Sequence, residues 1–223
     1  MTIKLFFQAL LKFLAGILLI ALMVFLPAGT LSYVQGWLFM GVLFIPMFFI
    51  GILLMIKSPD LLKRRLNAKE AEKKQDLVVK FSGLMFLVGF IIAGLDFRFG
   101  WIPIPQGVSY GAAILFLAAY ALYGEVMREN AYLSRTIEVC EGQKVVDTGL
   151  YGIVRHPMYS ATLLLFLSIP LVLGSLIALP VFLAYPLLLI VRIQNEEAFL
   201  EKELAGYSAY KQKVKYRLIP FIW

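Results

Sequence analysis

Two short segments carry the side chains that could do chemistry, and they flank one long apolar run. The side chains are Arg155, His156 and Tyr159 in "R-H-P-M-Y", and Arg192, Glu196 and Glu197 in "R-I-Q-N-E-E". A carboxylate can hold a cationic ligand, and the planar fork of an arginine can hold a carboxylate. Each residue alone would also suit a plainer role, as a headgroup anchor or as the acidic first turn of a helix. The whole set on both sides of one apolar run indicates a binding site.

Several kinds of site are excluded by what the chain lacks. His156 is the only histidine and Cys140 the only cysteine, so neither a usual zinc centre nor an internal disulfide is expected. The sequence has no dinucleotide-binding or P-loop glycine pattern and no G-x-S-x-G element. The apolar runs hold few charges apart from Lys12 and Arg192, which argues against an ion pump.

The composition predicts an all-α, polytopic membrane protein. Hydrophobic residues make up 61% of the 223 residues and charged residues 16%, against about 45–50% and about 25% in soluble domains. The mean hydropathy is +0.84. A membrane span needs roughly 20 mainly apolar residues. We therefore predict spans at Leu5–Leu26, Trp37–Ile56, Val78–Leu95 and Val108–Met127.

The apolar run between the two chemical segments, Ala161–Ile193, is too long for one ordinary span. Pro170, Gly174 and Pro180 interrupt it, and such residues punctuate helices. We predict a hairpin of two shorter helices, which gives about six spans, or five if the hairpin inserts only partly. The segments before and after the run then meet at the open end of the hairpin.

The distribution of Lys and Arg predicts the orientation in the membrane. Eight of these residues fall in Lys57–Lys80, whereas the loops Pro27–Gly36 and Ile169–Pro180 have none and the remaining loop has only Arg98. Both termini and the histidine segment should therefore be cytoplasmic, and a cysteine placed at Asn67 should resist labelling from outside. The net charge of +7 reflects this asymmetry, with a contribution from anionic lipid, and needs no nucleic-acid partner.

The two polar segments differ in their expected structure. Residues 128–159 show no helical period until Pro157, which suits the first turn of a helix. This places His156 at a helix N-terminus, whose dipole favours anions. The segment Asn195–Trp223 begins with the spacing of an amphipathic helix, which Gly206 is expected to break.

Both chemical segments belong to a longer pattern in the last third of the chain. It consists of "G-L-Y-G-I-V-R-H-P-M-Y", the hairpin, "R-I-Q-N-E-E-A-F-L" and "Y-S-A-Y-K-Q-K-V". From Thr136 to Trp223 the chain resembles the isoprenylcysteine carboxyl methyltransferase family. The wider group includes membrane phospholipid N-methyltransferases and, more distantly, sterol reductases. The resemblance implies an enzyme that binds S-adenosylmethionine in a cytoplasmic pocket, methylates the carboxylate of a lipid-modified cysteine and releases S-adenosylhomocysteine.

The resemblance also implies roles for individual residues. The cofactor pocket would be built around the R-H-P-x-Y element and the acidic pair, from Gln143, Val145, Val146, Tyr151, His156, Pro157, Met158, Tyr159, Glu196 and Glu197. One of the two glutamates would hold the ammonium group of the cofactor. Arg192 would lie near the substrate, and the expected catalytic set is Arg192, Glu196 and Arg155.

The expected chemistry makes modest demands on these residues. A carboxylate with a pKa near 4 is already deprotonated at neutral pH, so its methylation needs no strong general base. The protein must align nucleophile and methyl group and keep water away. An arginine such as Arg192 could orient the carboxylate through both of its oxygens.

These expectations divide the chain into a four-span transmembrane region, residues 1–127, and a catalytic region, residues 128–223. The expected substrate is a lipid-modified small molecule or peptide in contact with membrane lipids. No metal and no nucleic acid is expected. Three alternatives stay open: amine methylation of a phospholipid headgroup, reduction of a sterol-like substrate, and lipid binding without catalysis.

Overall fold

The chain folds into helices joined by loops, as seen in a computed structural model that describes residues 3–66, 73–134 and 136–223; within these ranges it has no strand. The long helices are α1 (Ile3–Ala28), α2 (Val34–Lys57), α4 (Lys73–Phe99) and α5 (Gln106–Glu129). The shorter ones are α3 (Pro59–Leu66), α6 (Pro157–Val172), α7 (Leu179–Phe182), α8 (Tyr185–Glu203) and α9 (Tyr207–Lys213), with a 3-10 turn η1 (Gly149–Gly152).

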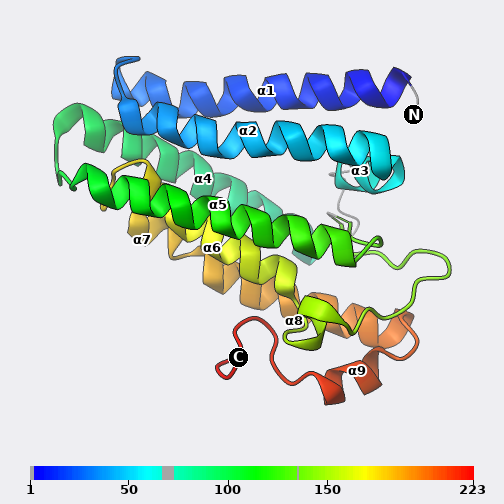
Figure 1. Cartoon of the computed structure of the whole chain (residues 1–223). Coiled ribbons are helices and arrows are strands. Elements are labelled where there is room, and N and C mark those ends of the chain that lie inside the picture. Colours follow the sequence, from blue (N-terminus) through cyan, green and yellow to red (C-terminus); the bar gives the residue numbers. More distant parts are fainter. Residues whose placement is uncertain (1–2, 67–72, 135) are drawn as a thin grey trace.

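The long helices run roughly side by side (Figure 1). α1 packs on α2 and α4, α5 packs along α6, and α4 also contacts α8. A chain of aromatic rings fills the space between them, formed by Phe39, Phe90, Phe116 and Phe182. The N-terminal end of α1, the short helix α3 and the helix α9 lie toward the same end of the bundle. We call this end, with the segment 130–159 and the tail after Glu203, the polar end.

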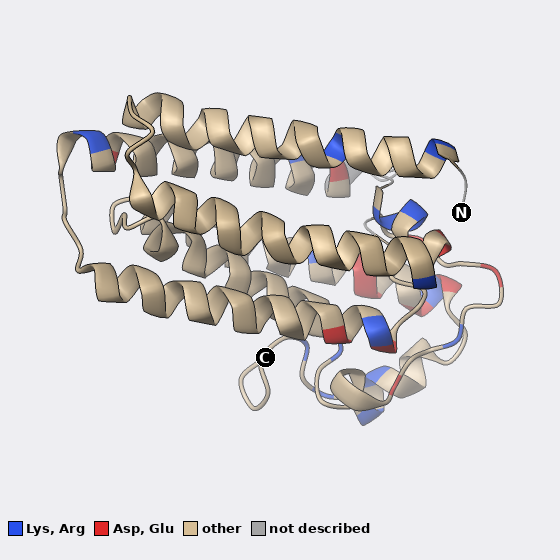
Figure 2. Cartoon of the chain, turned by 45° about the horizontal axis from the view of Figure 1, so that its top comes forward, with Lys and Arg blue, Asp and Glu red and all other residues tan. Residues whose placement is uncertain are grey.

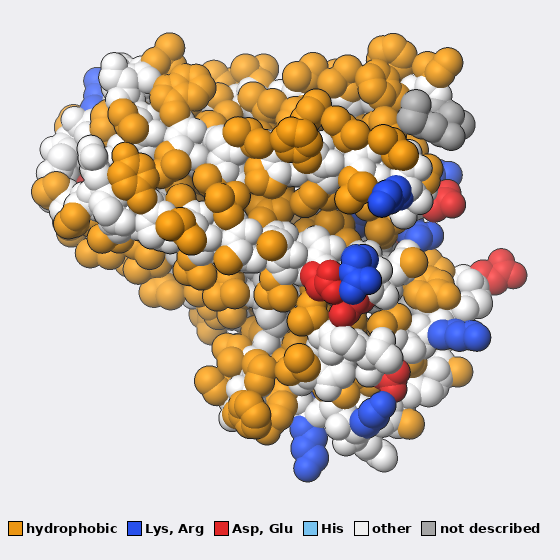
Figure 3. Space-filling view, in the orientation of Figure 1, with side chains coloured by type: hydrophobic (Ala, Val, Ile, Leu, Met, Phe, Trp, Pro, Cys, Tyr) orange, Lys and Arg blue, Asp and Glu red, His pale blue; other side chains and the backbone are white. Residues whose placement is uncertain are grey.

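Charge and hydrophobicity are separated along the bundle. Charged ribbon segments gather at the polar end, while the long helices are otherwise almost free of them (Figure 2). Hydrophobic side chains cover most of the outer face of α1, α2 and α5 (Figure 3). Many of these are exposed, among them Phe7, Leu26, Phe49 and Ile114. An exposed apolar surface of this extent suits a lipid environment rather than water.

Four of the predicted spans are present as helices that are long and apolar enough to cross a membrane. They cover Ile3–Ala28, Val34–Lys57, Gln75–Phe99 and Gln106–Glu129, and each includes the corresponding predicted run. The chain is thus a polytopic helical membrane protein with four candidate spans in its described part.

The predicted hairpin forms, but its arms are not ordinary spans. The first arm, α6, has 16 residues and is therefore about 24 Å long, short of the roughly 30 Å of hydrocarbon. The chain then turns through α7, and the second arm, α8, runs on into a charged last turn at Glu203. The prediction of six spans is supported for its first four, and full crossing by the hairpin stays a prediction.

The tail differs in part from the expectation. The amphipathic helix predicted after the hairpin is the continuation of α8 itself, because nothing between Arg192 and Glu203 interrupts the helix. The predicted break at Gly206 is confirmed: this residue has φ +86°, and α9 begins directly after it. Residues 136–148 have no helix, as expected from their lack of period.

Candidate functional site

A cavity of about 480 Å³ lies at the polar end, within the roughly 300–1,000 Å³ range of small-molecule sites. Its walls come from α4, α6 and α8, from the loop between α5 and η1, and from the N-terminal turn of α9. Segments far apart in the sequence therefore meet around one space.

Most of the side chains predicted as site residues line this cavity. Those that do are Gln143, Val145, Val146, Tyr151, Arg155, His156, Met158, Tyr159, Arg192 and Glu196. Pro157 and Glu197 are not part of the lining. Pro157 occupies the first position of α6, whereas Glu197 lies behind the wall, with only 2% of its surface exposed.

The wall around Tyr151 depends on a glycine that no other residue could replace without strain. Gly149 has φ +55°, and a Cβ there would lie 1.8 Å from an oxygen of Glu129. That carboxylate accepts hydrogen bonds from the Leu150 amide at 2.9 and 3.2 Å. Tyr151 is then held at both ends: its hydroxyl accepts from Asn130 at 3.0 Å, and its carbonyl accepts from the Tyr210 hydroxyl at 2.7 Å.

The R-H-P-x-Y element is fixed by the tail, which crosses it. The backbone amides of Arg155 and His156 donate to the carbonyls of Tyr216 and Arg217, each at 2.9 Å. Pro157 occupies the first position of α6. Its lack of an amide hydrogen costs nothing there, because an amide at that position would have no partner within the helix. The structure thus confirms the expected position of His156 at a helix N-terminus. The tail thus holds in place the element that forms part of the cavity wall.

Glu197 is the centre of a buried charge cluster. Its Oε1 accepts from Arg155 Nε at 2.7 Å and lies 3.3 Å from His156 Nε2. Its Oε2 accepts from Arg217 Nε at 3.0 Å, with Lys211 Nζ at 3.8 Å. Arg155 gives further hydrogen bonds to two backbone carbonyls of the tail. This cluster joins α8, the R-H-P-x-Y element and the tail.

The electrostatics of the cluster favour an ionised Glu197. Burial alone would raise the pKa of this carboxyl, but hydrogen bonds and charge from His156 and Arg155 outweigh it and lower the pKa to about 2. Removing one partner of such a buried set leaves the others without compensation, which typically costs several kcal/mol. Glu197 and Arg155 therefore have a structural task that their sequence motif does not reveal.

The neighbouring carboxylate, Glu196, has different surroundings. It lines the cavity and accepts a short hydrogen bond from the Tyr159 hydroxyl. That hydroxyl in turn accepts from Arg192 Nε at 2.8 Å, and the guanidinium lies over the Tyr159 ring. His156 also stacks on the ring of this tyrosine, with ring centroids 5.6 Å apart. The result is a connected polar strip on the cavity wall: Arg192, Tyr159, Glu196.

Beyond this strip the cavity becomes apolar. Its deeper wall is made by side chains of three helices, namely Val79, Gly83 and Phe86 of α4, Thr162 and Phe166 of α6, and Tyr185, Leu188 and Leu189 of α8. The site therefore offers charged groups at one end and hydrocarbon-like surface at the other. Such a division suits a ligand set that is partly ionic and partly lipidic.

Sequence reasoning missed several lining residues. Arg65 of α3 lines the cavity, donates to the Ser134 carbonyl at 3.3 Å and lies over the Tyr123 ring, yet it stands in a basic run that favours a solvated loop. Tyr207 lines it too, and its buried hydroxyl has no hydrogen-bond partner among the described residues. The only available signal for Tyr207 was its spacing from Tyr210 on one helix face.

A known protein family matches the part of the chain that contains this site. Residues 108–206 match the family model PEMT, phospholipid methyltransferase. The match covers less than half of the chain, but it contains both chemical segments and the hairpin. It supports a membrane methyltransferase-type enzyme with a lipid substrate, and enzymes of this family use S-adenosylmethionine. The wider group named by the sequence resemblance is thus supported, whereas the isoprenylcysteine type within it is a finer assignment.

A second comparison supports the same wider group of membrane enzymes. A Delta(14)-sterol reductase of Mus musculus is 33% identical to the chain over 137 residues. The alignment covers 54% of this chain and 33% of the reductase, so the chain spans about a third of the length of that relative. The likeness supports a distant relationship between this chain and the sterol reductases.

Proposed function

We propose that this protein is an S-adenosylmethionine-dependent methyltransferase that methylates a carboxylate on a lipid, such as an isoprenylated cysteine, where the membrane meets the cytoplasm. The observation that carries the proposal is the two-part cavity. One space joins the Arg192–Tyr159–Glu196 strip to an apolar chamber between helices that are themselves apolar on the outside. A soluble cofactor and a lipid could meet there without either leaving its own phase.

The cavity fits the cofactor by its size and its groups. A sulfonium and an ammonium are both cationic, and the wall supplies a carboxylate, Glu196, together with the aromatic faces of Tyr151, His156 and Tyr159. Aromatic faces attract such cations. Gln143, Val145, Val146 and Met158 would complete the wall around the cofactor. When bound, the cofactor would supply an electrophilic methyl group.

Arg192 is our candidate for orienting the acceptor. Its side chain belongs to the polar strip on the cavity wall, and Tyr159 accepts one of its hydrogen bonds. A substrate carboxylate beside this guanidinium would be held by charge-assisted hydrogen bonds. Its chain would then extend into the apolar chamber, and the surrounding rings would exclude water from the reacting groups.

Glu197 and Arg155 take supporting roles in this proposal. Their mutual ion pair and their bonds to the tail hold the R-H-P-x-Y element against α8. We therefore assign Glu196, rather than Glu197, to the ammonium of the cofactor. Arg155 becomes a positioning residue that fixes the wall behind His156.

A second candidate is amine methylation of a phospholipid headgroup, which the match to the phospholipid methyltransferase family favours. An amine must lose its proton before it can attack, so the turnover would rise with pH as the bound ammonium group is deprotonated. Glu196 is a carboxylate of the cavity wall that is placed to accept that proton. A carboxylate acceptor would show no such limb near neutral pH, because it is already ionised.

The proposed orientation puts the polar end in the cytoplasm, since the basic residues gather there (Figure 2). The cysteine test at Asn67 still applies, although Asn67 lies outside the residues that the structure describes. Labelling of that cysteine by a reagent outside intact cells would contradict the proposed orientation and indicate the opposite one.

The decisive experiment offers the purified protein labelled S-adenosylmethionine and three acceptors in separate reactions: a prenylcysteine acid, phosphatidylethanolamine and no added lipid. A base-labile labelled ester formed from the first acceptor supports the proposal. An alkali-stable label on the phospholipid selects the amine reaction instead. Absence of transfer and of any S-adenosylhomocysteine binding rejects both, and NADPH binding would then favour a reductase.

A further inference from the structure

Arg192 and Glu196 lie about one helical turn apart on α8, at positions i and i+4. Side chains with this spacing are neighbours on one face of a helix, and opposite charges there can form a direct ion pair. Asp76 and Lys80 on α4 have the same spacing and pair directly, with 2.6 Å between Lys80 Nζ and Asp76 Oδ2. Arg192 and Glu196 are instead joined through a third residue, which belongs to another helix.

That residue is Tyr159 of α6, whose hydroxyl is bonded to both charged groups. Arg192 Nε donates to the hydroxyl oxygen at 2.8 Å, and the hydroxyl donates its proton to Glu196 Oε2. An arginine can only donate, and an ionised carboxylate can only accept. A hydroxyl accepts on one side and donates on the other, so it satisfies both residues while it carries no charge itself.

The tyrosine is held in this place by contacts of its ring and its backbone. Its ring stacks on that of His156, with the centroids 5.6 Å and the planes 21° apart. Its carbonyl accepts a hydrogen bond from the Thr162 hydroxyl at 3.1 Å, and the same hydroxyl accepts from Tyr185 at 2.9 Å. Removal of the Tyr159 hydroxyl alone should therefore leave the ring in place and open a space between the two charged groups.

We infer that the Tyr159 hydroxyl is a spacer, which prevents Arg192 and Glu196 from neutralising one another and keeps them as two separate binding groups. Both residues line the cavity. The proposed reaction requires a carboxylate for the ammonium of the cofactor and, close to it, a cation for the acceptor. Tyr159 thus acts as a positioning residue through its two neighbours. The inference rests on the proposed function for what the two charges bind, whereas the spacer itself can be tested without it.

Without the hydroxyl, the two side chains should close into a direct ion pair. The attraction between two charges grows as their separation decreases and as water is excluded, and the vacated space is that of a single oxygen atom. A direct pair would compete with ligands for both charges. Ligand affinity would then fall because a new ion pair forms, and not because a contact to the ligand is lost.

Calorimetry with S-adenosylhomocysteine distinguishes these two causes. Tyr159→Phe should lower the affinity about 10-fold, and adding Arg192→Gln should restore it to within about 3-fold of the parent, because the glutamine removes the cation that captures Glu196. The des-amino analogue, which lacks the ammonium group, should bind all these proteins alike. A tyrosine that only contacts the ligand could not be rescued by the loss of Arg192. Unchanged affinity in Tyr159→Phe, or no recovery in the double variant, overturns the spacer.

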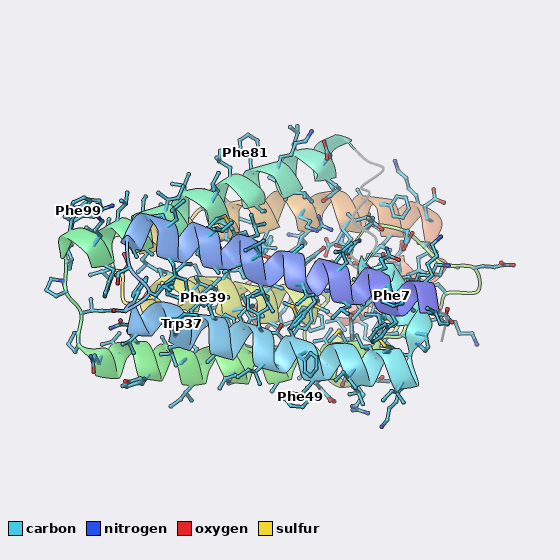
Figure 4. The ribbon with its side chains drawn as sticks, turned by 90° about the horizontal axis from the view of Figure 1, so that it is seen from above. Phe7, Trp37, Phe39, Phe49, Phe81 and Phe99 are labelled. Carbon is cyan, nitrogen blue, oxygen red and sulfur yellow. The ribbon has the colours of Figure 1, made fainter. Side chains whose placement is uncertain are left out.

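Tyr33→Phe is the matched control, since it removes the same atom from a buried tyrosine whose hydroxyl donates to the Leu173 carbonyl. Tyr33 does not line the cavity. It stacks on Phe97, with ring centroids 4.2 Å apart, at the end of the bundle where Phe99 lies, opposite Phe7 (Figure 4). The affinity of this variant for S-adenosylhomocysteine should be that of the parent.

A second measurement needs no ligand and separates the spacer from the reaction. Unfolding midpoints in detergent are measured for Arg192→Gln, Glu196→Gln and both changes together, first in the parent and then in Tyr159→Phe. The non-additive part of the two changes reports how strongly the two side chains interact. It should be larger in Tyr159→Phe, where they pair directly. This result supports the spacer even if the parent neither methylates an acceptor nor binds S-adenosylhomocysteine, and in that case only the proposed function fails. An equal or smaller non-additive part in Tyr159→Phe overturns the spacer whatever the activity.

Discussion

Each end of the helical bundle contains a buried carboxylate, and the two are used differently. At the end opposite the site, Asp96 accepts from the Ser175 hydroxyl at 2.6 Å and from the Ile102 amide at 3.1 Å. At the polar end, Glu197 is surrounded by Arg155, His156 and Arg217. Asp96 thus joins two loops through uncharged donors, whereas Glu197 joins three segments through cations.

The difference shows how the polar end can hold both a structural and a functional carboxylate. Glu197 pairs with the cationic side chains of Arg155 and Arg217, so those charges are compensated within the fold. Glu196, one residue earlier on α8, is left to face the cavity and Tyr159. At the opposite end, the hydrogen bonds of Asp96 to Ser175 and Ile102 join two loops. The polar end separates the charges that hold the fold from those offered to ligands.

The sharpest test of this separation compares Glu197→Ala with Glu196→Ala. Loss of Glu197 leaves Arg155 and Arg217 buried or half-buried without their anion, so the free energy of unfolding should fall by roughly 3–5 kcal/mol. Loss of Glu196 should change stability little and weaken S-adenosylhomocysteine binding. His156→Ala should also weaken binding. Thermal unfolding in detergent and calorimetry measure the two effects.

The comparison of the two glutamates would fail if Glu196→Ala destabilised the protein as much as Glu197→Ala. It would fail equally if Glu196→Ala bound S-adenosylhomocysteine like the parent. In the second case the acidic partner of the cofactor would have to be sought elsewhere on the wall.

The next largest effect concerns pH. The folded-state pKa of Glu197 is lowered to about 2 from its ordinary 4.5. The stabilisation from this group is therefore complete above about pH 4.5 and is lost progressively as the pH falls toward 2. Unfolding midpoints measured from about pH 5 to about pH 3 should decline in the parent. Glu197→Gln should start lower and decline less, and an equal decline in both proteins would assign the acid sensitivity to other carboxyls.

Arg192→Lys addresses the functional side of the polar end. A lysine could still extend to a membrane surface, but it cannot reproduce the planar fork of a guanidinium toward a carboxylate. We expect turnover to fall about 10-fold or more, equivalent to about 1.4 kcal/mol in the barrier, with expression and cofactor affinity retained. Turnover close to the parental value would show that Arg192 only anchors α8, and Arg155 would be the next candidate for the carboxylate.

The sequence predicted the parts of this arrangement that have a one-dimensional signal. Long apolar runs predicted the first four spans, and of the three residues expected to interrupt the hairpin only Gly174, with φ +74°, lies in its turn. Pro170 lies inside α6 and Pro180 inside α7. The sequence did not predict that α4 lines the cavity, because a helix that is apolar on every side has no polar face to mark the side that points toward a site. The different roles of Glu196 and Glu197 could not be predicted either. The two residues are identical and adjacent in the sequence, and only the elements that pack on each side of α8 distinguish them.

The smallest effect is expected at the opposite end, where Ser175→Ala removes the hydroxyl that donates to Asp96. A net hydrogen bond contributes about 1 kcal/mol, and the Ile102 amide still donates to the other carboxylate oxygen. The same hydroxyl also accepts from the Ala178 amide at 3.2 Å, so the free energy of unfolding should fall by about 1–2 kcal/mol, less than in Glu197→Ala. Cofactor affinity and turnover should be unchanged, because neither Asp96 nor Ser175 lines the cavity. A change in S-adenosylhomocysteine affinity in Ser175→Ala would show that the two ends are coupled through α4 and the hairpin, and that the opposite end does more than close its loops.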